Sequence, residues 1–150
     1  MPDSLKSQLQ ADMKSSMKSG DKARLGVIRL MLSAIKQVEV DERIELDDTR
    51  IIAVLDKMVK QRRESISQFA SAGRDDLTAI EQAELEIIGE FMPEALSEAE
   101  IEALIEQSLA ATGASSIRDM GKVMGMLKPQ LQGRADMGQV SQLIKSRLSA

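Results

Sequence analysis

The residues of this sequence best suited to bind a ligand are lysines and arginines that lie close to glycines. They lie in GKVMGMLKPQLQGRADMG, residues 121–138, which holds four of the chain's nine glycines although its surroundings are typical of helix. A glycine inside a helix costs about 0.5–1 kcal/mol relative to alanine. Two glycines four residues apart, Gly121 and Gly125, would let a ligand approach the backbone, and neighbouring lysines and arginines would attract an anion. A phosphate backbone satisfies both conditions, so the segment predicts a nucleic-acid contact.

Helical periodicity places these glycines away from the core. One side of the predicted helix carries the apolar residues Met120, Val123, Met124, Leu127 and Leu131. The opposite side carries Arg118, Gly121, Lys122, Gly125 and Lys128. A glycine pair could equally mark a place where a neighbouring helix crosses closely. Within the same helix, Pro129 removes one backbone donor.

The segment after this helix predicts a tight turn. Gly133 is expected to cap the helix, and Arg134 lies in the turn. Asp136 should cap the last helix, with Gln139 three residues later completing a capping box. Asp136 would then occupy the anion site that the first N–H groups of a helix form, so the functional case at this turn rests on Arg134 and Lys128. The residues predicted to bind RNA are Arg118, Gly121, Lys122, Gly125, Lys128, Gly133, Arg134 and Lys145.

The composition excludes much catalytic chemistry. The chain has no histidine and no cysteine, which removes the imidazole base, the thiol nucleophile and the usual zinc ligands. A serine–lysine pair formed by Ser65 or Ser67 with Lys60 is conceivable, but surface serines are far more often only polar. We therefore expect no catalytic residue, no metal, no cofactor and no enzymatic activity of the chain on its own. With only two phenylalanines for base stacking, RNA would be recognised by shape and backbone.

Charge is distributed unevenly along the chain. Residues 1–74 carry a net charge of +3, residues 75–113 hold 11 acids and no lysine or arginine, and residues 114–150 carry +4. The acidic segment 75–106 raises a second hypothesis, an adaptor that docks another protein, although a solvated acidic face is the simpler interpretation. The absence of cysteine, of a secretory signal and of a membrane-length apolar run predicts a cytoplasmic protein with no membrane partner.

Strong helix formers dominate the sequence, and no strand pattern is present, so the fold is predicted to be all-α. Helices are expected over about 5–19, from residue 22 to about 40, over 48–72, from about 76 to Pro93, and over 98–112, before the glycine helix and the last helix. Predicted inward residues include Leu5, Leu9, Met13 and Met17 in the first helix, Ile80 in the fourth, and Val140, Leu143, Ile144 and Leu148 in the last. We expect an N-terminal domain of helical hairpins, residues 1–94, and a smaller C-terminal three-helix tail domain, residues 95–150.

Several of these segments together resemble the YqeY-like family over essentially the whole chain. The matching stretches are DKARLGVIRLMLSAIKQVEV, VLDKMVKQRRESISQF, AGRDDL, EQAELEIIGEFMPEALSEAEI and GKVMGMLKPQLQGRADMGQVSQLIKSRL. The resemblance implies an all-helical protein of two domains.

The C-terminal part is similar to the tail domain of the B subunit of the tRNA-dependent amidotransferase. That motif maps onto Gly121 to Met124, onto Gly133 to Asp136, and onto Val140, Leu143, Ile144 and Lys145. In that enzyme, a carbon–nitrogen ligase with glutamine as amido donor, the tail contacts tRNA and does no chemistry, so the resemblance implies tRNA binding without catalysis. One departure is Met137, which stands where family members often have the glycine that is here Gly138.

Overall fold

The computed structural model describes residues 4–149, which form helices and no strand, so the predicted all-α fold class is confirmed. The helices are α1 (Leu5–Ser19), α2 (Lys22–Glu42), α3 (Asp48–Ser71), α4 (Asp75–Gly89), α5 (Glu98–Thr112), a short 3-10 helix η1 (Ile117–Asp119), α6 (Met120–Leu131) and α7 (Met137–Ser149). The chain divides into two compact units, one ending at Met92 and the other beginning at Pro93.

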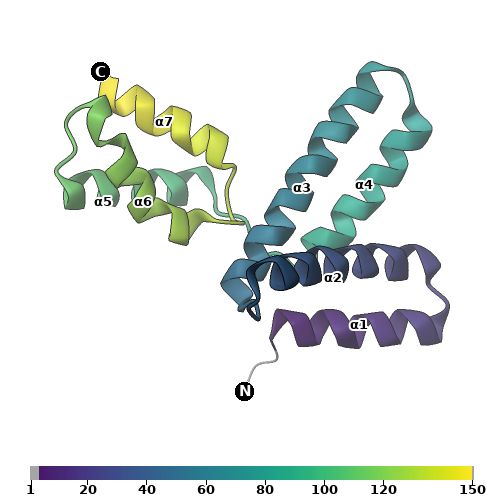
Figure 1. The fold of residues 1–150 in the computed structure, drawn as a ribbon. Helices are drawn as coiled ribbons and strands as arrows, with labels where there is room; N and C mark the ends of the chain where they lie inside the picture. Colours follow the sequence, from purple (N-terminus) through teal and green to yellow (C-terminus); the bar gives the residue numbers. More distant parts are fainter. Residues whose placement is uncertain (1–3, 150) are drawn as a thin grey trace. The chain divides into compact units, whose positions relative to one another are not determined.

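The first unit contains two helical hairpins, α1 with α2 and α3 with α4 (Figure 1). Short local signals set the helix ends. The side chains of Ser4, Asp21 and Asp47 accept hydrogen bonds from backbone N–H groups in the first turns of α1, α2 and α3. Gly20 ends α1 with a φ of 76°, a left-handed conformation that glycine adopts without a steric penalty.

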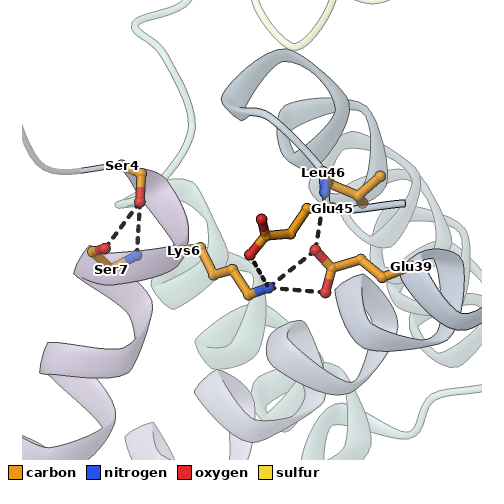
Figure 2. Close-up of polar contacts among 6 residues, drawn as sticks. All are labelled: Ser4, Lys6, Ser7, Glu39, Glu45 and Leu46. Carbon is orange, nitrogen blue, oxygen red and sulfur yellow. Dashed lines mark hydrogen bonds and ion pairs between the residues drawn. The ribbon is translucent and has the colours of Figure 1, made fainter. Parts of the chain in front are cut away.

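A buried carboxylate joins the elements at one end of this unit. Glu39, on α2, is only 7% exposed. Its two oxygens accept hydrogen bonds from Nζ of Lys6 on α1, at 2.9 and 3.0 Å, and one of them also accepts the N–H of Leu46, at 2.9 Å (Figure 2). The pKa of Glu39 lies below its ordinary value, mainly because of the hydrogen bond from the Leu46 N–H and secondly because of the bond from the Lys6 ammonium. This network ties α1, α2 and the α2–α3 connection together.

A second polar cluster ties α4 to α1 and α2. The Arg24 guanidinium bonds both carboxylate oxygens of Asp12, at 2.8 and 2.7 Å, and one oxygen of Glu90, at 2.8 Å. It also lies over the Phe91 ring, 5.9 Å from the centroid. The hydrogen bonds from Arg24 lower the pKa of Asp12, and both carboxylates raise the pKa of Arg24.

Two residues of the first unit predicted to face inward are instead exposed. Met17 is 54% exposed. Each step of four residues turns about 40° around a helix, so Met17, two such steps after the buried Leu9, points about 80° away from it. Ile80 is 56% exposed, because the inward side of α4 follows the half-buried Leu77 and the buried Ile88, and Ile80 lies about 60° and 80° around the helix from them.

Two helix ends also differ from those predicted. α2 continues to Glu42, and α4 stops at Gly89 rather than at Pro93. The N–H groups of Phe91 and Met92 bond carbonyls three residues earlier, which tightens the chain into turns before the proline is reached.

The second unit contains α5, α6 and α7 around its own core. Its buried residues are Ile105 from α5, Val123, Leu127 and Leu131 from α6, and Val140, Ile144 and Leu148 from α7. A capping box of Ser97 and Glu100 starts α5 as predicted, and Gly113 ends it with a φ of 65°. Leu143 was predicted to face this core but is 41% exposed, because it lies about 100° around α7 from the buried Ile144.

Candidate nucleic-acid interface

The glycine side of α6 is open. Gly121 and Gly125 are exposed, and a Cβ added to either would have no neighbouring atom within 4 Å in the described part of the chain. Val123 and Leu127, on the opposite side, are fully buried in the core of the second unit. No helix of this unit therefore crosses α6 at the glycines, and the helix-crossing interpretation is wrong for the unit.

Two lysines flank these glycines on the same helix. Lys122 and Lys128 are exposed, and their separation of six positions in the sequence places their Cα atoms about 9 Å apart along the helix axis. Neither side chain makes an ion pair or a hydrogen bond with any of residues 4–149. We name Gly121, Lys122, Gly125 and Lys128 the glycine face.

Asp119, the acid nearest in sequence, is already bonded elsewhere. Its Oδ2 accepts the N–H groups of Ser115 and Ser116, at 3.0 and 3.3 Å. These bonds, followed by the charge of Lys122, hold its pKa below the ordinary value. Lys122 therefore stays available to an external anion.

Arg118 and Lys145 are exposed cations on other elements. Arg118 was expected on the glycine helix, but it belongs to the 3-10 helix η1. The α-helical turn of 100° per residue therefore cannot be used to assign it to one side of α6. Lys145 lies on α7, about 100° around that helix from the buried Ile144. Like those of the two lysines of the glycine face, their side chains make no ion pair or hydrogen bond with any residue from 4 to 149.

The turn between α6 and α7 is engaged in holding the second unit together. Gly133 has a φ of 78°, in the left-handed region, and is half-buried. Arg134 is also half-buried: its Nε donates to the carbonyl of Glu94, at 3.0 Å, and its own carbonyl accepts the N–H of Leu96, at 2.9 Å. The structure thus gives Arg134 a role in fixing the start of the unit, whereas the side chains of Arg118, Lys122, Lys128 and Lys145 are exposed and unpaired within residues 4–149.

The start of α7 is closed to anions, as the sequence predicted. Oδ1 of Asp136 accepts the N–H groups of Gly138 and Gln139, at 2.9 and 3.4 Å. The Gln139 side chain forms no bond back to Asp136, so only half of the predicted capping box is present. A Cβ on Gly138 would stand 3.2 Å from the same Oδ1, which explains the glycine at this position.

The sequence showed that Pro129 removes a backbone donor, but not that the carbonyl it leaves unpaired is that of Gly125 on the glycine face. α6 continues past Pro129 to Leu131, and Pro129 has no N–H to donate to the carbonyl of Gly125. The helix therefore presents a carbonyl without its usual partner beside a glycine that carries no side chain. The spacing Gly-x-x-x-Pro was the signal that could have revealed it.

The acidic segment 75–106 is divided between the two units, at Met92 and Pro93. Several of its carboxylates are paired within their own unit: Glu84 with Arg62, Glu90 with Arg24, and Glu106 with Arg147. The adaptor hypothesis for this segment stays a prediction.

No helix within residues 4–149 is both long enough and apolar enough to cross a membrane.

Comparison with known proteins gives a family match over nearly the whole chain. The model of the family described as Yqey-like protein matches residues 6–148. Among curated proteins, the chain is similar to Altered inheritance of mitochondria protein 41, mitochondrial, of Pyrenophora tritici-repentis, with 31% identity over 146 residues, covering 95% of this chain and 80% of that protein.

Proteins of the same name in two yeasts match over shorter stretches. Identity is 40% over 85 residues in Eremothecium gossypii and 38% over 87 residues in Saccharomyces cerevisiae. These alignments cover 56% and 57% of this chain and 46% and 47% of the yeast proteins, so the match spans about half the length of these relatives.

Proposed function

The chain belongs to the YqeY-like family, and from this premise we propose that it is a non-catalytic helical module that binds structured RNA, with tRNA as the specific candidate. The observation that carries the proposal is the open glycine face of α6, with Lys122 and Lys128 unpaired beside it. Bare backbone lets a phosphate–sugar chain approach closely, and unpaired ammonium groups neutralise it without first breaking an internal ion pair.

The chemistry of the face favours RNA recognised through its backbone. Ribose 2′-hydroxyls can donate hydrogen bonds, and the Gly125 carbonyl, which Pro129 leaves without its helical donor, is an acceptor for one of them. No aromatic ring lies on α6 or α7 to stack a base. Recognition by shape and backbone, rather than by base identity, is therefore the proposed mode.

The similarity of the second unit to the amidotransferase B-subunit tail makes tRNA the first RNA to test. In this proposal the chain supplies binding and positioning, as a tail does, and any amide transfer to aminoacyl-tRNA belongs to another protein. A cytoplasmic location also stays a proposal, and the relatives whose names carry the word mitochondrial add the mitochondrion as the competing compartment.

The test is the salt dependence of tRNA binding by the full chain. If helical RNA behaves like duplex DNA, four phosphate contacts give a slope of about −3.6 when the logarithm of the tRNA association constant is plotted against the logarithm of salt concentration. The four contacts are assigned to the exposed, unpaired side chains of Arg118, Lys122, Lys128 and Lys145. The Lys122→Gln/Lys128→Gln variant should lower the slope to about −1.8 and weaken binding about 60-fold at about 0.1 M salt. Both substitutions are on the surface, so the melting temperature should stay nearly unchanged.

The matched control is Lys14→Gln/Lys18→Gln, which removes the same charge from exposed, unpaired lysines of α1. It should leave the slope near the wild-type value. If both variants lost tRNA affinity and salt slope equally, the attraction would be diffuse and spread over the whole chain. If the α6 variant kept the wild-type slope, the glycine face would be ruled out as the binding site.

A further inference from the structure

A groove between α5 and α7 is the strongest feature of the second unit outside the glycine face. It encloses about 560 Å³. Its lining includes Ile101 of α5 and Leu143 of α7, and Leu143 is 41% exposed. A leucine this exposed, beside a second apolar residue and in a depression, is a contact surface without an internal partner.

The rim of the groove is acidic. Glu98, Glu102 and Asp136 line it, and none of its lining residues is basic. Arg147, which stands outside the lining, bonds Glu106 at 3.0 Å and lies 3.6 Å from Glu102. Glu98 has no ion pair among residues 4–149; it lies in the first turn of α5, where only the helix dipole offsets its charge. Such a rim repels a nucleic-acid phosphate and attracts lysine and arginine.

The shape of the groove matches a helix. On α7 the lining positions include Gln139, Leu143 and Ser146, which follow the helical repeat over about two turns, or about 10 Å. On α5 they occupy the first turns, where Glu98 and Glu102 stand four residues apart. An amphipathic helix can lay an apolar stripe along Leu143 and Ile101 and place basic side chains over both edges.

We propose that this groove binds a basic amphipathic helix of a partner protein, so that the second unit carries a protein site in addition to the RNA face. The charge of the rim selects the partner: an acidic or neutral helix would leave Glu98 facing like charge or no charge. The proposal does not depend on RNA binding at α6, and the two can fail separately.

The experiment uses the ¹⁵N-labelled full chain and a synthetic helical probe. The probe is an alanine-based peptide of about 14 residues, or about 21 Å as a helix, with a leucine stripe flanked by lysines, and its twin carries glutamates in place of the lysines. The lysine probe should shift amide signals in residues 98–102 and 139–146. Leu143→Ser should weaken its binding about tenfold and Glu98→Gln about threefold.

Leu30→Ser is the matched control, because Leu30 is a leucine of similar exposure, 48%, on α2 of the first unit. It should bind the probe like the wild type. Equal binding of the glutamate twin, shifts outside the groove, or equal affinities of Leu143→Ser and Leu30→Ser would overturn the proposal. It would also be overturned if Leu143→Ser weakened tRNA binding, or if it dissolved a dimer seen by analytical ultracentrifugation, since the groove would then hold RNA or a second copy.

Discussion

Replacing Gly125 by alanine should raise the stability of the protein and weaken its RNA binding. Gly125 lies in the middle of α6, and a Cβ there would meet no atom within 4 Å in residues 4–149 beyond its chain neighbours and the adjacent helix backbone. The substitution therefore brings the helix-propensity gain of alanine, about 0.5–1 kcal/mol, without a steric penalty. For a small domain this corresponds to a rise in melting temperature of about 2–8 °C.

RNA affinity should change in the opposite direction. If a phosphate–sugar chain lies against the bare backbone of α6, the new methyl group holds it away from the helix and from the carbonyl of residue 125. We expect affinity to fall about threefold to tenfold, or about 0.7–1.4 kcal/mol. A destabilised protein can lose binding simply by unfolding, but a variant more stable than the wild type cannot.

The assay compares thermal unfolding, followed by circular dichroism, with fluorescence anisotropy of labelled tRNA. The matched control is Gly26→Ala on α2, where an added Cβ also meets no atom within 4 Å. It should give a similar stability gain and leave RNA affinity unchanged. If Gly125→Ala became more stable and bound tRNA as tightly as the wild type, close backbone approach would not be the reason for this glycine, and the reasoning would be refuted.

Three further predictions concern stability. Because folding lowers the pKa of Glu39, its carboxylate contributes fully to the free energy of unfolding above the ordinary pKa near 4.5, and this contribution is lost as the pH falls through the folded-state pKa. Glu39→Gln should therefore lower the urea midpoint of unfolding at neutral pH and make that midpoint fall less steeply on acidification. Arg24→Met should lower the free energy of unfolding by about 1–3 kcal/mol, because it leaves Asp12 without its bonded partner; calorimetry should find a smaller loss for Arg24→Lys. Gly138→Ala should not give the gain expected for Gly125→Ala in thermal unfolding, because its Cβ would stand 3.2 Å from Oδ1 of the capping Asp136.

The sequence by itself determined the fold class and most helix ends. Ser97 with Glu100 starts α5, and Gly113 ends it, where the local pattern predicted. Such signals are readable because a cap or a left-handed glycine acts over three or four residues and needs no distant partner. The same locality made the outward side of α6 predictable, since Gly121 and Gly125 lie opposite Val123 and Leu127 on any regular helix.

Tertiary structure alone decided which candidate groups are used inside the protein and which remain free. Arg134 and Lys128 are both cations near the same turn, yet the Arg134 side chain bonds the carbonyl of Glu94, 40 residues away in sequence, while the Lys128 side chain makes no hydrogen bond or ion pair with any of residues 4–149. Leu143 and Ile144 are adjacent apolar residues, yet one is exposed in a groove and the other is fully buried. Burial and pairing depend on where other helices pass, and that arrangement is set by packing across the whole unit rather than by the order of neighbouring residues.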